Sequence, residues 1–297
     1  MKSALRGIDK IFTAPIVPEL SGARVRRIIG TPYLRRLDPF LTFDHYCVRL
    51  PSGFTDHPHR GFETVTYNLK GKIFHEDFKG RKGIIGPGDC QWMTAGKGIV
   101  HAEMPGSWDE DSEGLQLWIN LPIKEKLCEP QYQEVPKDTI PRTTKDNTTV
   151  KVIAGESLGV KGPIFHRTPT YFIDVEMEKE GKLEQCIPKN WNGLCYVYEG
   201  VAYFGANQEK AQENQAVVLK NEDNDTLLIK TKGEKAKFVI VAGQLLNEPI
   251  IRYGPFVLGS EEQLLKSFED YEKGINGFEG SKQFVSKIRE MAFKGSK

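Results

Sequence analysis

The chain has 297 residues, of which 39% are hydrophobic and 27% charged, a composition typical of a globular protein large enough for two domains. Its 41 basic and 40 acidic residues leave a net charge of +1, so the overall charge gives no reason to expect direct nucleic-acid binding. No stretch has the roughly 18 apolar residues of a membrane span, and the amino terminus lacks the apolar core of a secretory signal. We therefore expect neither membrane insertion nor secretion.

The five cysteines are odd in number and scattered, and none forms a Cys-x-x-Cys pair. This pattern favours reduced thiols over a disulfide framework. It predicts a cytosolic or nuclear compartment.

The first part of the chain reads as a many-stranded β-domain. From about Arg24 to Leu121, short apolar runs alternate with glycine, proline, aspartate and asparagine. The clearest strand runs from Glu63 to Leu69, and the segment GLQLWINLP shows the same alternation. We place this domain at residues 1–134.

Two short segments in this domain carry ligand-type side chains. His57-Pro58-His59 is followed some forty residues later by His101-Ala102-Glu103. Residues i and i+2 of a β-strand point to the same face, so each segment directs two donor atoms into one cavity. Three neutral imidazoles and one carboxylate suit a divalent transition metal such as iron, nickel, copper, manganese or zinc. The sequence therefore predicts a metal site inside a β-barrel.

Glu63 competes with Glu103 for the carboxylate position, because it lies four residues after His59. An unbroken strand would turn Glu63 and the apolar face of its strand toward the histidines. A bulge at Arg60-Gly61 would instead shift the parity and turn Glu63 away. We prefer Glu103, and Glu63 remains an alternative ligand or an acceptor that orients an imidazole.

The other candidate residues have simpler explanations. His45, His75 and His166 lack a partner at ligand spacing, and we expect all three to be structural. Many glycines fit turns with positive φ. No P-loop, GxGxxG fingerprint or GxSxG elbow is present, so nothing indicates a nucleotide site or a serine or cysteine hydrolase.

A polar, proline-interrupted segment, EVPKDTIPRTTKDN, predicts an interdomain linker at residues 135–147. A second β-pattern at residues 148–259 contains LCYVYEG, which is similar to TVTYNLKG of the first domain. Matching Gly200 with Gly71 predicts an internal duplication whose second copy has lost its ligands. In that match Cys186, Pro188 and Asn192 stand where His57, His59 and Glu63 stand in the first copy.

The last segment, residues 260–297, shows a helical pattern of apolar residues in place of the alternation of strands. Ser260 and Gln263 can form a capping box, and Leu264, Leu265, Phe268 and Tyr271 recur at helical spacing. We expect a mostly helical tail that packs on a β-domain.

Several longer motifs resemble the pirin family of the cupin superfamily. They are HPHRGFETV, PGDxQWMTAGxGIxHAEMP, GLQLWxNLP, EPQYQE and GPFV, and the resemblance runs from about Gly22 to the carboxyl end. It implies an all-β bicupin, two antiparallel jelly-roll barrels face to face with a metal in the amino-terminal barrel only. The family's ligands fall on His57, His59, His101 and Glu103, and the implied metal is Fe(2+).

The resemblance implies two kinds of activity. Many members are described as quercetin 2,3-dioxygenases, whose partners are a flavonol and O2. The animal protein is described as an iron-dependent redox coregulator of NF-κB-type transcription factors, found in the nucleus and the cytoplasm. We expect a monomer in either case.

For the enzyme, the hypothesis is that a flavonol coordinates the metal through its deprotonated 3-hydroxyl before O2 opens the ring. Glu103 would then be the general base, or equally a fixed metal ligand. For the coregulator, Lys79, Arg81 and Lys82 form a short basic run that either belongs to a partner-binding surface or, as is usual for such a run, is a solvated loop. A cavity lined by aromatic residues would favour the enzyme, whereas a cramped cavity with a basic rim would favour the coregulator.

Overall fold

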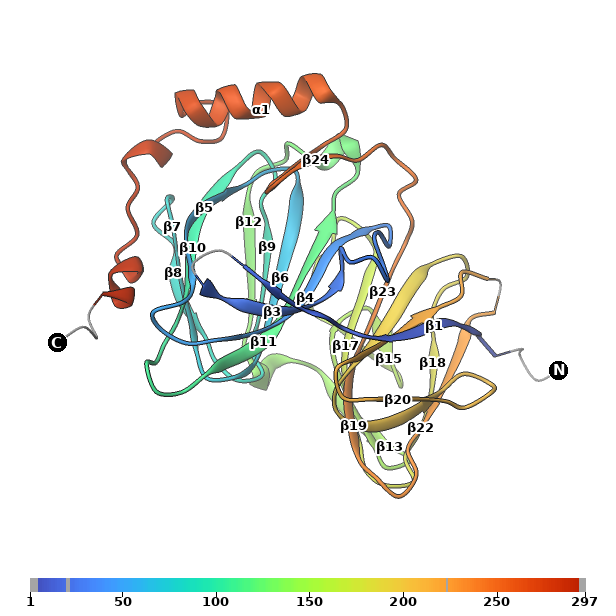
Figure 1. Ribbon diagram of the computed structural model, residues 1–297. Helices are drawn as coiled ribbons and strands as arrows, with labels where there is room; N and C mark the ends of the chain where they lie inside the picture. Colours follow the sequence, from blue (N-terminus) through green and yellow to red (C-terminus); the bar gives the residue numbers. More distant parts are fainter. Residues whose placement is uncertain (1–4, 20–21, 223, 294–297) are drawn as a thin grey trace. The chain divides into compact units, whose positions relative to one another are not determined.

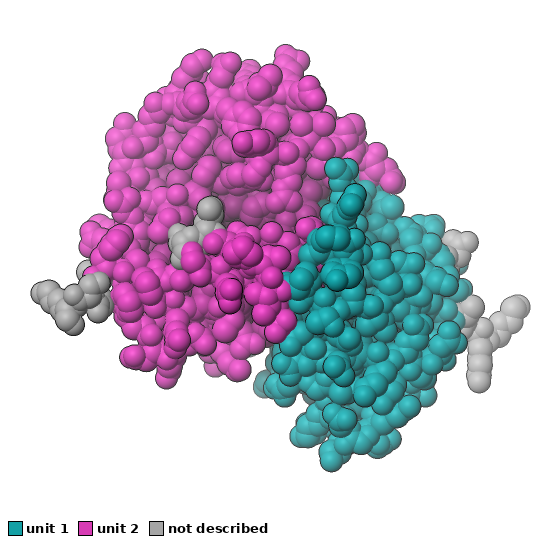
Figure 2. Space-filling view, viewed as in Figure 1, with its two compact units in different colours: residues 1–15, 31–39, 138–246 teal, residues 16–30, 40–137, 247–297 magenta. Residues whose placement is uncertain are grey.

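The computed structural model describes residues 5–19, 22–222 and 224–293. It divides into two compact units, each assembled from separate stretches of the chain (Figure 2). Unit 1 contains residues 1–15, 31–39 and 138–246, and unit 2 contains residues 16–30, 40–137 and 247–297. Among the described residues, no helix is long and apolar enough to cross a membrane.

Unit 2 contains two antiparallel sheets, and both predicted metal-binding segments lie on the smaller one (Figure 1). One sheet has the strand order β12-β9-β6-β11-β4-β3-β2, and the other has the order β5-β10-β7-β8. A separate hairpin pairs β24 with β25. The strands are β2 (Ile16–Pro18), β3 (Arg24–Ile29), β4 (Phe40–Val48), β5 (Phe54–His59), β6 (Phe62–Lys70), β7 (Ile73–Asp77), β8 (Lys82–Ile85), β9 (Cys90–Thr94), β10 (Ile99–Pro105), β11 (Ser112–Asn120), β12 (Gln131–Val135), β24 (Ile251–Tyr253) and β25 (Phe256–Leu258).

Unit 1 is also an antiparallel β-structure. Its main path is β1-β21-β19-β23-β17-β14-β13, with β18 paired to β22, and with β20 and β22 paired to β19. A small hairpin pairs β15 with β16. The strands are β1 (Ile8–Thr13), β13 (Arg142–Lys145), β14 (Thr148–Ala154), β15 (Glu156–Ser157), β16 (Val160–Lys161), β17 (Thr170–Met177), β18 (Lys182–Cys186), β19 (Asn192–Phe204), β20 (Glu209–Gln212), β21 (Gln215–Leu219), β22 (Thr226–Lys230) and β23 (Ala236–Gly243).

The two units share one strand order. The path β9-β6-β11-β4-β3-β2 of unit 2 corresponds strand by strand to β21-β19-β23-β17-β14-β13 of unit 1. The edge strands β12 and β1 take the same place in the two sheets, but β12 comes last in the chain order of its path and β1 comes first. In the smaller sheets, β18 pairs with β22 as β5 pairs with β10. The shared order agrees with the predicted duplication. Strands β18 and β22 thus correspond to β5 and β10, the strands that carry the predicted ligands in unit 2. Their side chains Leu183, Leu227 and Ile229 are buried in an apolar core.

The compact units differ from the predicted boundaries of 1–134, 135–147 and 148–259. Strand β1 belongs to unit 1, because it pairs with β21 and buries Ile8 and Phe12 there. Part of the predicted linker forms β13, which extends the sheet of unit 1 by pairing with β14. Residues 247–259 belong to unit 2, where β24 and β25 lie. Strands that pair across long sequence separations cause each difference.

The carboxyl-terminal segment contains the expected helix, α1 (Glu261–Lys273), beside β24 and β25 (Figure 1). The Ser260 side chain accepts a hydrogen bond from the Gln263 amide at 3.2 Å, and the helix ends at Gly274, whose φ is 68°. Leu264 and Phe268 of the helix pack against Phe256 in unit 2. The rest of the tail is less helical than predicted, because further glycines with positive φ interrupt it. The short 3-10 turns of the chain are η2 (Ile123–Glu125), η3 (Lys137–Thr139), η4 (Ser281–Gln283) and η5 (Ile288–Ala292).

Candidate metal centre

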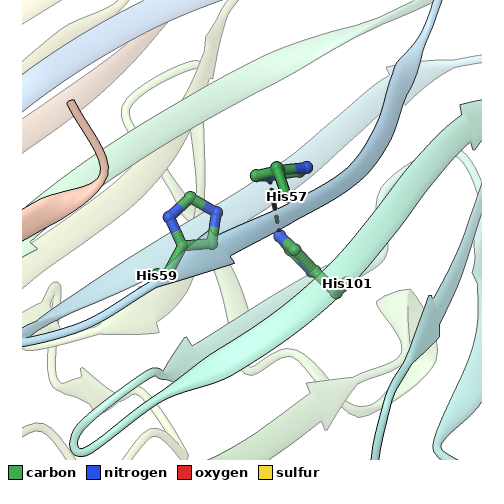
Figure 3. Close-up of side chains that lie close together, drawn as sticks. All are labelled: His57, His59 and His101. Carbon is green, nitrogen blue, oxygen red and sulfur yellow. Dashed lines mark hydrogen bonds between the residues drawn. The ribbon is translucent and has the colours of Figure 1, made fainter. Parts of the chain in front are cut away.

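Three of the four predicted ligands form a cluster in unit 2. His57 and His59 extend from β5 and His101 from the neighbouring strand β10, with their rings facing one another (Figure 3). In the strand register His101 lies directly opposite His57, which places both side chains on one face of the sheet. One ligand nitrogen from each of the three rings lies within 4.8 Å of the others. Of the groups searched in the described part of the chain, this is the one that is able to hold a metal.

The hydrogen bonds of the cluster leave nitrogen lone pairs directed inward. The Nδ1 atom of His57 donates to the Thr55 carbonyl oxygen at 2.7 Å, so a neutral His57 carries its lone pair on Nε2. That Nε2 lies 3.1 Å from Nε2 of His101. Two nitrogens bound at right angles to one ion at about 2.1 Å would lie about 3.0 Å apart. The Nδ1 atoms of His59 and His101 are buried without a hydrogen-bond partner among the described residues. The cluster therefore fits a divalent transition metal.

Burial keeps these imidazoles neutral in the metal-free protein. It lowers the pKa of His57, although the hydrogen bond to the Thr55 carbonyl opposes the shift. Burial also lowers the pKa of His59 and of His101 well below the usual range, and in both cases the neighbouring His57 adds to the effect. A neutral imidazole is the form that binds a metal, so the cluster is ready for ligation at neutral pH.

Glu103 lies beside the three histidines but outside their cluster. One of its oxygens, Oε2, is 4.0 Å from Nε2 of His101, and the side chain is 4% exposed. Both oxygens accept hydrogen bonds, from Thr66 Oγ1 at 3.1 Å and from Gln116 Nε2 at 3.1 Å. The Trp118 indole N–H donates to Oε1 of Gln116 at 3.2 Å, which turns the amide NH2 toward Glu103. Glu103 is thus held at the edge of the cluster by three neighbouring side chains.

Glu63 lies on the face of β6 opposite to the residue that bonds to Glu103. The extended strand is interrupted at Arg60-Gly61, between the end of β5 and the start of β6, where Gly61 has a φ of 88°. Thr66, three residues after Glu63 and therefore on the opposite face of β6, bonds to Glu103. Glu63 accepts a hydrogen bond from Thr94 at 2.7 Å, and the acceptor that orients His57 is the Thr55 carbonyl. The face of β6 that carries Thr66, and not the face that carries Glu63, is therefore turned toward Glu103. The alternative in which an unbroken strand turns the apolar face of β6 toward the histidines is wrong.

The three remaining histidines lie outside the cluster. His45 pairs with Glu113 at 3.0 Å, and His75 pairs with Glu134 at 3.1 Å while its ring stacks on Tyr132. His166 belongs to unit 1 and is half-buried.

The histidine cluster opens into a cavity of about 320 Å³ within unit 2. Phe54, Tyr46 and Trp118 form its aromatic walls. Trp118 also packs edge-on against His59, with 5.2 Å between ring centroids. The strand alternation in GLQLWINLP could have identified Gln116 and Trp118, since they share the face opposite the leucines.

One cavity residue, Arg252, comes from the segment that returns to unit 2 after unit 1. Its guanidinium group lies 5.0 Å from the centre of the Trp118 ring. No local pattern connects it with the histidine motifs, which lie about 150 to 195 positions earlier in the sequence, so sequence reasoning missed it.

Comparison with known proteins identifies the family. The family model of pirin matches residues 22–119, and the model of the pirin C-terminal cupin domain matches residues 172–277. Pirin from Rattus norvegicus is 48% identical over 271 residues, which cover 90% of this chain and 92% of that protein. This chain belongs to the pirin family. Its two antiparallel β-units are accordingly the two cupin domains of a bicupin, as predicted.

Solved structures of pirins and cupins share this fold. Quercetin 2,3-dioxygenase from Acinetobacter baumannii is 29% identical, with a TM-score of 0.82 over 91% of this chain and 98% of its own. The bacterial pirin YhhW from Escherichia coli, solved in complex with nickel(II), is 19% identical. Its TM-score is 0.63 over 81% of this chain and 98% of its own, so it shares the fold.

Proposed function

We propose that this pirin is a quercetin 2,3-dioxygenase, which uses both atoms of O2 to open a flavonol and releases carbon monoxide. The observation that carries the proposal is the histidine cluster at the wall of an aromatic-lined cavity of about 320 Å³. That volume is within the range of small-molecule sites. An aromatic cavity next to the cluster is the feature that favours an enzyme over a regulator with a cramped site.

The relatives support the same reaction class. The Acinetobacter baumannii protein with this fold is named a quercetin 2,3-dioxygenase, and the Escherichia coli pirin was solved with nickel(II). We propose Fe(2+) as the metal of this chain, held by His57, His59, His101 and Glu103. Imidazole ligands suit iron and nickel alike, so recombinant protein needs its metal content defined.

A bound metal would supply Lewis acidity and a redox-active centre for O2. The protein's own residues supply orientation and proton transfer. The walls formed by Phe54 and Trp118 hold the flat rings of the flavonol and exclude water. Glu103 Oε2, which faces His101, accepts the proton of the 3-hydroxyl, while Gln116 and Thr66 keep the carboxylate aimed into the cavity.

The test is reconstitution with Fe(2+) under argon, followed by quercetin and air. Loss of the flavonol absorbance and release of carbon monoxide report the reaction. His101→Ala should abolish both together with metal binding, whereas His166→Ala, a histidine of unit 1, should behave as the wild type. A fully metal-loaded wild type that leaves quercetin intact would refute the enzyme.

Glu103→Gln separates the two roles of Glu103. Loss of turnover with full metal content supports the general base. Loss of metal supports a ligand. Full turnover with full metal would show that Glu103 is neither required as a base nor as a ligand.

The second candidate is an iron-dependent redox coregulator that binds an NF-κB-type transcription factor. The observation in its favour is the 48% identity to mammalian pirins, for which the family resemblance implies that role. The basic run adds little to this candidate, because Arg81 pairs with Asp77 at 3.6 Å and lies over the Tyr132 ring. Capture of the factor that differs between Fe(II)-loaded and Fe(III)-loaded protein would support this role, and equal capture by both would count against it.

Both candidate functions are compatible with the same oligomeric state and the same location in the cell. We propose a monomer in the nucleus and the cytoplasm, to be checked by light scattering and by imaging of a tagged chain.

A further inference from the structure

Several charged side chains that line the cavity have partners of opposite charge. Arg27 donates two hydrogen bonds to the carboxylate of Asp44, at 2.9 and 2.8 Å, and a further one to Glu19. Asp56 accepts hydrogen bonds from the Ser286 amide and lies 3.5 Å from Arg289. These cavity charges have partners within the protein.

Arg252 has no such carboxylate. Its Nη1 donates to the Leu41 carbonyl at 3.1 Å and to Thr42 Oγ1 at 2.9 Å, and its Nε donates to the Gly254 carbonyl at 3.2 Å. All three acceptors are neutral. In the described part of the chain, no acidic group forms a hydrogen bond or ion pair with Arg252, and its Nη2 has no hydrogen-bond partner. The carboxylates of Asp44 and Glu19, which line the same cavity and are bound by Arg27, act on its charge from a greater distance. An exposed but immobilised guanidinium with a free N–H group is a ready binding site for an anionic oxygen.

The position of this guanidinium links it to the histidine cluster. Arg252 lies over Trp118 at 5.0 Å, and the Trp118 ring packs against His59. His59, Trp118 and Arg252 all line the same cavity, so an aromatic ligand bound against Trp118 lies within reach of both other side chains.

We propose that Arg252 is the residue that determines substrate specificity, by binding a phenolate oxygen at the end of the flavonol that lies away from the histidines. The inference rests on the proposed function and narrows its substrate class to flavonols with an ionised hydroxyl on the distal ring. The 7-hydroxyl of a flavonol is its most acidic phenol, so it is the group that Arg252 recognises. A charge-assisted hydrogen bond of this kind contributes roughly a 10-fold to 100-fold gain in affinity.

The experiment measures binding without turnover. Metal-reconstituted protein under argon, at mildly alkaline pH, is titrated with quercetin, its 7-O-methyl ether and its 4′-O-methyl ether, and dissociation constants are taken from calorimetry. Wild type is compared with Arg252→Gln and Arg252→Lys. Arg142→Gln, an identical change on the exposed strand β13 of unit 1, is the matched control.

We expect the wild type and Arg142→Gln to bind quercetin at least about 10-fold more tightly than its 7-O-methyl ether. They should bind the 4′-O-methyl ether about as tightly as quercetin. Arg252→Gln should lose the preference, because it binds all three with the affinity of the 7-O-methyl ether, and Arg252→Lys should recover part of it.

Other results overturn the assignment in distinguishable ways. Equal affinities in the wild type, or a preference that survives in Arg252→Gln, would remove Arg252 from recognition and leave the dioxygenase standing. A uniform loss of affinity together with metal loss in Arg252→Gln would make the residue merely structural. Failure of the loaded wild type to bind any of the flavonols would reject the proposed function and this inference together.

Discussion

Replacing Asp270 by asparagine should loosen the contact between helix α1 and the strand that carries two of the clustered histidines. Arg60, the residue after His59, is 2% exposed, and its Nη1 donates to Oδ2 of Asp270 at 2.8 Å. The same guanidinium donates to the carbonyl oxygens of Lys97 and Asn276, both at 2.6 Å, and lies 4.7 Å from the centre of the Phe278 ring. Arg60 therefore connects the end of β5 to the carboxyl-terminal segment through a buried ion pair and hydrogen bonds.

The expected cost follows from the burial of this pair. The Asp270→Asn change leaves the Arg60 charge buried without a carboxylate, which costs about 3–5 kcal/mol. Glu269→Gln on the same helix is the matched control, since Glu269 pairs with Lys273 at 3.1 Å with both side chains exposed. Loss of that pair should cost only about 0.3–0.5 kcal/mol.

Hydrogen exchange of the α1 amides is the appropriate assay, because it reports local opening in a chain of two units. Asp270→Asn should accelerate exchange in α1 roughly 100-fold to several thousand-fold, and Glu269→Gln less than about threefold. Metal affinity should fall with Asp270→Asn, since His59 is adjacent to Arg60. Similar exchange rates in the two variants would refute the argument that the buried ion pair fastens the helix.

Three further outcomes are expected. Gly61→Ala should destabilise unit 2 by about 2 kcal/mol or more in denaturant titrations, because a Cβ would lie 2.0 Å from a backbone carbonyl oxygen; Gly80→Ala, at a similar φ of 84° but in open space, isolates the strain of the positive φ alone. A hydrogen bond from the buried His45 lowers the pKa of Glu113 to about 2. The ionised Glu113 therefore stabilises the fold fully above about pH 4.5, and this stabilisation is lost as the pH falls toward 2. The melting temperature of Glu113→Gln should fall less over that pH range than that of the wild type. A divalent metal at about a hundred times its dissociation constant should stabilise the protein by about 2.7 kcal/mol, and thermal denaturation of His59→Ala should show no such gain.

The sequence was sufficient for the histidines because their geometry is local. Two-residue alternation places His57 and His59 on one face of β5, and the same rule applies to His101 on β10. Pairing of these two strands then needs only that both belong to one barrel. The helix α1 was predictable for the same reason, since its cap and its apolar spacing lie within a dozen residues.

The alternation rule failed where the backbone changes direction. Gly61 takes a positive φ between β5 and β6, so parity does not carry over from His59 to Glu63. The Arg60-Gly61 pair indicated that such a break was possible, but its presence depends on tertiary contacts. One of these is the hydrogen bond from the Val257 amide to the Arg60 carbonyl, across almost two hundred residues.

Long-range pairing explains the remaining differences. Strand β1 has nothing in its own sequence that assigns it to unit 1 rather than to unit 2, because an edge strand is defined by its partner, here β21. Arg252 likewise reaches the cavity only because residues 247–297 return to unit 2. Neither the pairing of β1 with β21 nor the position of Arg252 in the cavity can be predicted from neighbouring residues in the sequence.

The two barrels show what a buried polar site requires of a fold. Both have the same strand order, yet unit 1 fills the places of the ligand strands with leucine and isoleucine, which need only apolar neighbours. Unit 2 places imidazoles and a carboxylate there, and each buried polar group must be given a partner if it is not to cost stability. Thr55, Thr66 and Gln116 provide such partners from within the barrel. The returning segment adds α1 and the anchor for Arg60, and the strand order of unit 1 shows no counterpart among the residues described. The two units thus differ in the partners and the support that they provide for polar side chains.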